Sequence, residues 1–143
     1  MKTIVRKITA TIPSGHSYDI VLLVFRVLLS AELMYAHGLK KLGIGIAEAE
    51  QVPNPLQLPE LWNSFFAISA NLFFPVLVML GLFTRLTVLP ILAVTLTGYF
   101  VLHFHDAPLI KDTPFMYSLS YLLIFFLGAG KYSLDHYINR KYS

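Results

Sequence analysis

The sequence predicts an all-α integral membrane protein, built as a four-helix bundle with both termini on the cytoplasmic side. Three observations support this fold class: an apolar composition, four apolar runs, and an uneven distribution of Lys and Arg. Of the 143 residues, 56% are hydrophobic and only 13% are charged, and the mean hydropathy is +0.65. A soluble domain of this length needs a more polar surface, so lipid is expected to surround much of the chain.

Four apolar segments are long enough, or nearly so, to cross a bilayer. A helix needs about 20 apolar residues to cross a hydrocarbon core of roughly 30 Å. The predicted spans are about 18–37, 61–83, 86–104 and 115–131, with the last continuing as a helix beyond the apolar run. Residues 38–60 hold three glutamates and three prolines, which predict an outer loop rather than a span. The whole chain, 1–143, is expected to form a single membrane domain.

The orientation follows from the positive-inside rule. With the N-terminus inside, the inner side holds seven Lys and Arg residues and the outer side holds three. The inner set is Lys2, Arg6, Lys7, Arg85, Lys131, Arg140 and Lys141, and the outer set is Lys40, Lys41 and Lys111. Cytoplasmic segments carry the excess of basic residues, so both ends are predicted to be inside. No small-residue cleavage site follows the first run, which predicts an uncleaved first span rather than a signal peptide.

The residue counts exclude several kinds of chemistry. The chain has no cysteine, so disulfides, thiolate zinc sites, cysteine-held iron–sulfur clusters and covalent c-type haem are excluded. The formal net charge is +3. Since the basic residues stand at the ends of apolar runs, they are explained by the membrane surface, and nucleic acid is not expected as a partner.

Ionisable residues inside the predicted spans indicate a polar interior. Charged groups at membrane depth are costly and usually face the bundle, so each needs a partner. Arg26 and Glu32 point roughly 120° apart at ~100° per residue, so they cannot pair as a stacked couple. The predicted intramembrane polar pocket consists of Arg26, Ser30, Glu32, Asn71, Tyr99 and Tyr121. The alternative is that these groups only hold the bundle together, because hydroxyls in membrane helices often bond their own backbone.

A second group of polar residues is predicted at the outer face. It consists of His37, Lys40, His103 and His105, which stand at or after the ends of the first and third spans. Neutral imidazoles beside Asp106 would suit zinc, copper or iron. His-x-His spacing is weak evidence for a metal site and interfacial histidines are common, so no metal is predicted.

Three stretches then combine into a recognisable pattern. They are Arg26 followed by His37–Leu42, Gly81–Leu86 in the tight turn between the second and third spans, and Gly128–Asp135 after the fourth. In this order and spacing the chain resembles the DoxX family of small four-helix bacterial membrane proteins. The predicted inner-face motif within these stretches is Arg85, Lys131 and Asp135, with Asp135 either capping a helix or pairing with one of the two basic residues.

The resemblance implies a multi-pass protein of the bacterial cytoplasmic membrane that is tied to redox metabolism. The family is similar to the small subunit of a thiosulfate:quinone oxidoreductase. Family members usually have a glutamate ten positions before the glycine of the tight turn, where this chain has Asn71. If that glutamate neutralises the first-span arginine, Glu32 is the obvious substitute here, reaching Arg26 from the other side of its helix.

Three functions fit the sequence. The first is an accessory or quinone-site subunit of a membrane redox system, in which electrons need an organic cofactor or an oxidoreductase partner because the chain has no electron carrier of its own. The second is a non-catalytic assembly partner of a larger membrane complex. The third is a small-solute or ion transporter, which would require a homo-oligomer because four short helices enclose only a narrow path. No residue is identified as catalytic.

Overall fold

The computed structural model describes residues 15–142, and every regular element in that range is a helix. The first helical segment is continuous over Gly15–Lys41. It consists of α2 (Gly15–Leu33), the π-helical turn η1 (Met34–Gly38) and α3 (Leu39–Lys41). The remaining elements are α4 (Glu60–Leu80), α5 (Thr84–Thr97), the π-helical turn η2 (Gly98–Leu102), α6 (Pro108–Leu127) and α7 (Leu134–Tyr142).

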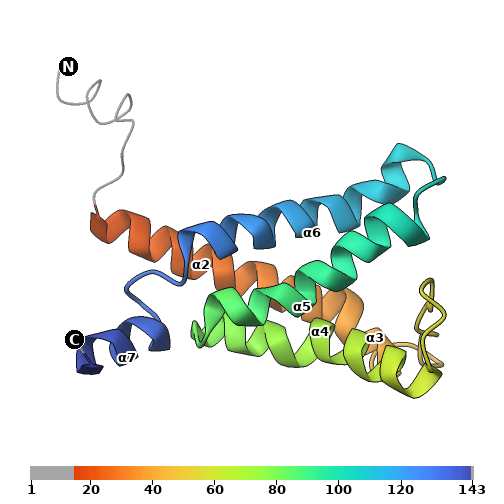
Figure 1. Ribbon diagram of the computed structural model, residues 1–143, viewed down its shortest axis with the longest axis horizontal. Coiled ribbons are helices and arrows are strands. Elements are labelled where there is room, and N and C mark those ends of the chain that lie inside the picture. Colours follow the sequence, from red (N-terminus) through yellow and green to blue (C-terminus); the bar gives the residue numbers. More distant parts are fainter. Residues whose placement is uncertain (1–14, 143) are drawn as a thin grey trace.

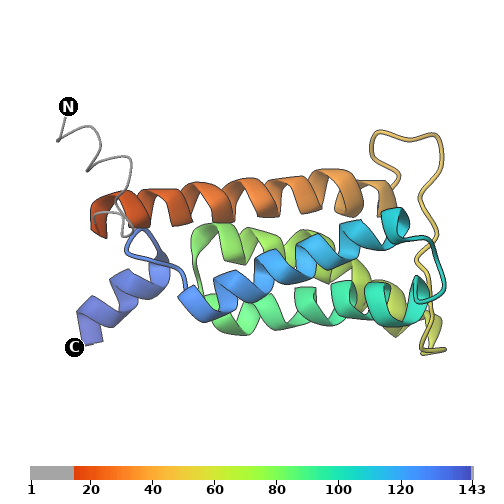
Figure 2. The same cartoon turned by 90° about the horizontal axis from the view of Figure 1, so that it is seen from above.

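The four long helices lie alongside one another in an elongated bundle (Figures 1 and 2). α2 packs on α4, α4 on α5, and α5 on α6. One end of the bundle, here called the α7 end, holds the start of α2, the α4–α5 turn and the short helix α7. The opposite end, here called the loop end, holds the outer loop 42–59 and the connection 103–107.

Three helical segments are long and apolar enough to cross a membrane: Gly15–Lys41, Glu60–Leu80 and Thr84–Leu102. They coincide with the first three predicted spans to within a few residues. Large apolar side chains on their outward faces are exposed, among them Leu28 at 64% and Phe65 at 66%. Such faces are stable in hydrocarbon, because each helix satisfies its own backbone hydrogen bonds. The chain is therefore a multi-pass membrane protein in contact with lipid.

The predicted helical continuation of the fourth span, 115–131, through Lys131 is wrong, and the helix that holds this span begins before residue 115. α6 begins at Pro108, since proline suits the first turn of a helix, where its missing N–H has no partner to lose. The helix ends at Leu127 because Gly128 has φ 77° and ψ −166°, a conformation open almost only to glycine. The earlier start brings Lys111 and Asp112 into α6, and α6 is not among the three spanning candidates.

An apolar core fills the space between the four long helices. It consists of Leu33, Val78, Val88, Ile91, Leu92, Tyr121 and Ile124. The Tyr121 hydroxyl donates to Ser30 Oγ at 3.2 Å and so joins α6 to α2. A second buried pair, Ser118 and Thr95, joins α6 to α5 with 2.9 Å between the hydroxyl oxygens. Two pairs of helices are thus connected by hydroxyls that are satisfied within the protein.

The α4–α5 turn depends on a glycine. Gly81 follows α4 with φ +68°, and a Cβ there would lie 2.5 Å from the Cβ of Ser133 and 2.9 Å from an Arg26 nitrogen. We predict that Gly81→Ala lowers the free energy of unfolding by about 1–2 kcal/mol for the left-handed backbone and by about a further 1–3 kcal/mol for the overlap.

The matched control is Gly45→Ala in the outer loop. Gly45 has φ +82° but no atom within 4 Å of an added Cβ, so this variant has the backbone strain without the overlap. Thermal unfolding in detergent, followed by size-exclusion chromatography, measures both variants. Equal losses of stability in the two would contradict close packing at Gly81.

Candidate functional site

The polar residues of the spans do not form one pocket. Arg26 contacts the segment between α6 and α7, at the α7 end. Asn71 lies against Gly38 and lines a cavity at the loop end. The predicted pocket that combined these two residues is therefore divided into two sites with different surroundings.

Arg26 is buried, with 1% of its surface exposed. Its guanidinium donates to the carbonyl oxygen of Ala129 and, over 2.8 Å, to the carbonyl oxygen of Tyr132. It also lies directly against Gly81, whose missing side chain leaves the room that the guanidinium occupies. Arg26 thus attaches the non-helical segment 128–133 to the bundle through its two terminal nitrogens, while its buried Nε has no hydrogen-bond partner among the described residues.

Asp135 binds the start of α5. One carboxylate oxygen accepts from the N–H of Phe83 at 2.7 Å, and the other accepts from the N–H of Thr84 at 2.9 Å. The N–H of Asp135 in turn donates to the Gly81 carbonyl at 2.8 Å. A carboxylate in this position satisfies the free N–H groups of a helix N-terminus. Of the predicted alternatives for Asp135, the structure shows the helix cap.

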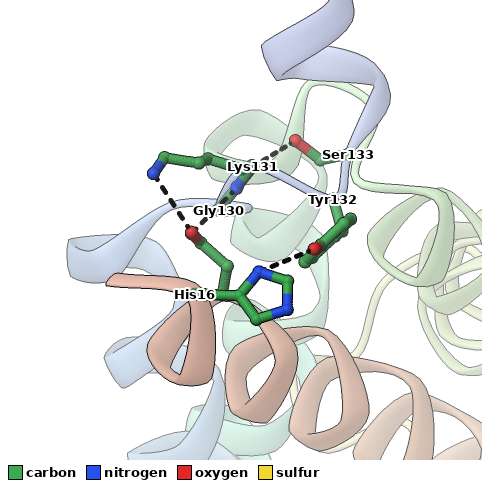
Figure 3. A network of polar contacts seen from close by, with 6 residues as sticks. His16, Gly130, Lys131, Tyr132 and Ser133 are labelled. Atoms are coloured by element: carbon green, nitrogen blue, oxygen red, sulfur yellow. Dashed lines mark hydrogen bonds and ion pairs between the residues drawn. The ribbon is translucent and has the colours of Figure 1, made fainter. Parts of the chain in front are cut away.

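The basic residues of the inner-face motif have partners that the sequence analysis did not identify. Lys131 binds Asp19, which is only 6% exposed. The backbone nitrogen of Lys131 lies 3.2 Å from one Asp19 carboxylate oxygen, and Nζ of Lys131 lies 3.4 Å from the other. Figure 3 shows this region, in which the Tyr132 hydroxyl also lies 3.2 Å from Nδ1 of His16. Arg85 is exposed and donates from Nε to the carbonyl of Phe125, at the end of α6.

Residues from all three sequence stretches therefore meet at the α7 end. We call Arg26, Gly81, Asp135 and the segment 128–133 the Arg26 network. The hydrogen bonds of Arg26 and Asp135 in this network join one helix to the end of another or to the connecting segment. The network is explained by helix capping and attachment of the chain, and needs no ligand.

The hypothesis that Glu32 balances the charge of Arg26 is wrong. Glu32 is exposed, whereas Arg26 is buried and directed toward segment 128–133. The backbone carbonyls of Ala129 and Tyr132 serve as the acceptors for the guanidinium instead of a carboxylate of the same helix.

A cavity of about 470 Å³ lies at the loop end. Its walls come from η1, α4, α5, η2 and α6, and the outer loop contributes Val52, Leu56 and Leu58. The loop is held in place by Asn63, whose side-chain amide donates to the Pro53 carbonyl at 3.0 Å. Pockets of this size with mostly apolar walls and a few polar groups are typical of small-molecule sites.

Asn71 is the buried polar group of this cavity. Its side chain lines the space and is 4% exposed. Among residues 15–142, the Asn71 amide has no hydrogen-bond partner. Its amide atoms are not among the fully enclosed unpaired groups of this range, which are Arg26 Nε and Thr84 Oγ1, so the amide stays open to a ligand or water in the cavity. Gly38 packs against this part of α4, where an added Cβ would lie 2.5 Å from the Asn71 carbonyl.

His37 and Tyr117 form another part of the wall. Their rings meet edge to face with centroids 5.5 Å apart. Lys41 also lines the cavity and donates from Nζ to the His37 carbonyl at 3.2 Å. Both π-helical turns contribute to the cavity wall, because His37 belongs to η1 and Gly98 belongs to η2. Such turns interrupt regular helices and occur often at functional sites.

The predicted outer-face cluster is brought together only in part. His37 and His103 line the same cavity, whereas Lys40 and His105 do not. Nδ1 of His103 lies 2.7 Å from the Asp106 carboxylate, and the ring of His105 packs edge to face on Phe104. In the part of the chain that the structure describes, no three His, Asp or Glu side chains form a group that would hold a metal ion.

The other predicted pocket residues lie elsewhere. Ser30 and Tyr121 belong to the core, where they bond each other. Tyr99 packs against the rings of Phe100 and Phe115 and does not line the cavity. Of the six residues predicted for one polar pocket, only Asn71 lines the cavity at the loop end.

Comparison with known families matches residues 21–104 to DoxX, more than half of the chain. The chain belongs to the DoxX family. The matched region contains Arg26, Asn71 and Arg85, and it ends before α6 and the segment 128–135. No curated protein and no solved structure matches the chain. Family membership agrees with a small membrane protein, and the site itself must indicate the function.

Sequence reasoning missed several residues of both sites. Asp19 had a signal that could have been used, since a carboxylate at the start of a membrane span needs a partner. Tyr117 and Glu50 had none, because an aromatic residue in a span and an acidic residue in a loop are both common. Their place in the cavity wall depends on how the helices and the outer loop fold together.

The cap provided by Asp135 is directly testable. We predict that Asp135→Ala lowers the free energy of unfolding by about 1–2 kcal/mol, because two N–H groups at the start of α5 lose their acceptor. Asp135→Asn should cost less, since the amide oxygen still accepts one bond. The control is Asp112→Ala, which removes an exposed carboxylate from α6. Thermal unfolding in detergent measures all three, and equal effects of Asp135→Ala and Asp112→Ala would contradict the cap.

Proposed function

We propose that this DoxX-family protein is a quinone-binding component of a redox system in the bacterial cytoplasmic membrane. The observation that supports this most strongly is the buried Asn71 amide, which lines a cavity of about 470 Å³ without a protein partner. The cavity lies at the end of membrane-crossing helices, where the ring of a lipid-soluble quinone would enter from the hydrocarbon region.

The residues of the cavity suit both forms of such a ring. An amide has donors and an acceptor, so Asn71 can donate to a quinone carbonyl or accept from a quinol hydroxyl without a change in its own charge. The neutral His37 imidazole, on the same wall, has one ring nitrogen that donates and one that accepts a hydrogen bond. Apolar walls from Leu33, Phe66 and Ala67 would exclude water around the ring.

The bound quinone would supply the electron-carrying chemistry that the side chains of this chain lack. With no cysteine in the sequence, thiolate electron carriers are absent. The proposal therefore includes an oxidoreductase partner that exchanges electrons with the quinone. The role of this chain is to bind the ring, orient it through Asn71 and exclude water.

Filling the cavity should prevent this binding. Ala67 lines the cavity and is 9% exposed, so Ala67→Phe would occupy the space of the ring. We predict at least about tenfold weaker retention of a short-chain quinone in this variant, and about tenfold weaker retention in Asn71→Leu, which removes a hydrogen bond worth about 1–1.5 kcal/mol. Equilibrium dialysis of the purified protein, with quantification of the quinone, measures both.

The matched control is Ala31→Phe on the exposed face of α2, which should bind as the unmodified protein does. Normal binding by both cavity variants would contradict the proposed function. A purified protein that binds no quinone but is always isolated with a larger complex would indicate the assembly-partner function instead.

We also propose that α6 is a fourth span and that both termini face the cytoplasm. α6 packs along α5, and its residues from Phe115 to Leu127 are mostly apolar. The α7 end holds Arg85, Lys131, Arg140 and Lys141, against Lys40, Lys41 and Lys111 at the loop end. Three further inner residues of the prediction, Lys2, Arg6 and Lys7, lie outside the described residues.

The absence of native cysteine makes this topology easy to test. We predict that an impermeant maleimide labels Glu48→Cys in intact cells and labels Arg140→Cys only after the membrane is permeabilised. Both positions are exposed, so burial does not limit the reaction. Labelling of both variants in intact cells would contradict an even number of spans, and the reverse pattern would contradict the orientation.

A further inference from the structure

A second hollow, of about 500 Å³, lies at the α7 end and is separate from the cavity at the loop end. It is bordered by the start of α5, by the segment after α6 and by one face of α7. Its lining includes Phe83, Arg85, Leu86, Asp135, His136 and Asn139. We call it the α7 hollow. It shares no residue with the cavity at the loop end, so a ligand here would be independent of the proposed quinone.

The α7 hollow lies at the boundary of the membrane. The spanning segment Thr84–Leu102 begins at its wall. Phe83 and Leu86 are at its edge and are exposed by 60% and 67%, so the hollow opens onto surface that is suited to lipid chains. On α7, Tyr137 is 67% exposed, and tyrosines commonly settle at the level of lipid headgroups.

Arg85 provides the cationic group of the hollow. Its Nε donates to the Phe125 carbonyl, which fixes the guanidinium against the end of α6. Among the described residues, Arg85 has no carboxylate partner, so its charge is not neutralised within the protein. A guanidinium held in this way binds a phosphate oxygen through short, charge-assisted hydrogen bonds.

Two further polar side chains come from α7. The ring of His136 and the side-chain amide of Asn139 line the hollow, and neither has a hydrogen-bond partner among residues 15–142. Asp135 lines it as well, but both of its oxygens already accept from N–H groups at the start of α5. Its negative charge disfavours a doubly charged phosphate monoester and is compatible with a singly charged phosphodiester.

We infer that the α7 hollow binds the phosphodiester headgroup of a phospholipid. Arg85 contacts the phosphate, His136 and Asn139 donate to its oxygens or to the headgroup, and the acyl chains leave past Phe83 and Leu86 into the bilayer. Three observations support a phospholipid over a soluble phosphate compound as the ligand. They are the preformed hollow, the arginine without a carboxylate partner, and the apolar opening at the membrane boundary.

Native mass spectrometry of the full-length protein tests this inference. The protein is purified in detergent, depleted of lipid, and incubated with phosphatidylglycerol or phosphatidylethanolamine. Arg85→Gln should reduce the bound fraction about tenfold, the value expected for a lost charge-assisted hydrogen bond. The matched control is Arg140→Gln, which removes an exposed arginine of α7 that does not line the hollow and should leave binding unchanged.

Since Arg85 also bonds the end of α6, a second variant keeps the test independent of folding. Asn139→Trp places a large ring in the hollow from an exposed position and leaves every Arg85 bond in place. It should reduce lipid binding as Arg85→Gln does, with an unchanged thermal midpoint. Equal lipid binding by Asn139→Trp and the unmodified protein would overturn the inference.

A third arm distinguishes the source of the phosphate. Excess inorganic phosphate, a monoester-like anion, should not displace the lipid. Complete displacement would overturn the assignment to a phospholipid and would indicate a site for free phosphate. Quinone binding should be unchanged in Asn139→Trp, so failure of this inference and failure of the proposed function give different results.

Discussion

A buried arginine whose two terminal nitrogens donate to backbone carbonyls is the constraint on which the α7 end depends. Placing a guanidinium among membrane helices is costly unless its donors are satisfied. In this DoxX-family protein the acceptors are the carbonyls of Ala129 and Tyr132. These carbonyls are available to Arg26 because the chain leaves the helical conformation at Gly128. Gly81 leaves room for the guanidinium, and Asp135 then joins the same segment to α5. Arg26 and the second and third motif stretches thus contribute to one structural unit, whereas His37–Leu42 lies at the loop end.

This arrangement separates the Arg26 network from the cavity in which we propose that a ligand binds. Because Arg26 is buried and directed toward segment 128–133, it does not line the cavity at the loop end. The cavity there depends instead on a neutral amide, an imidazole and apolar walls, with Asn71 as its buried polar group. An uncharged group at this position has no need of a buried counter-charge. This explains how the chain accommodates Asn71 at the position where the family resemblance implies a glutamate.

The sequence predicted the helices well and the contacts of their polar residues poorly, for a physical reason. Apolar runs determine where a chain enters lipid, so α2, α4 and α5 were found to within a few residues. The partners of Arg26 are backbone carbonyls, and because every residue has one, residue types in the sequence do not indicate which carbonyls accept from Arg26. Glu32 illustrates the limit: its angle from Arg26 was calculable, but the position of segment 128–133 was not. The cavity likewise depends on two π-helical turns and on an outer loop that folds back over the bundle.

The central claim is that Arg26 supports the fold and does not bind the ligand of the cavity. Hydrogen–deuterium exchange of Arg26→Lys, in parallel with quinone retention by the same sample, tests it most directly. A lysine keeps the charge but cannot donate to both carbonyls in the geometry of a guanidinium. The account predicts faster exchange of the amides in 128–135, unchanged exchange in 52–58, and normal quinone retention. Loss of quinone with unchanged protection of 128–135 would contradict it.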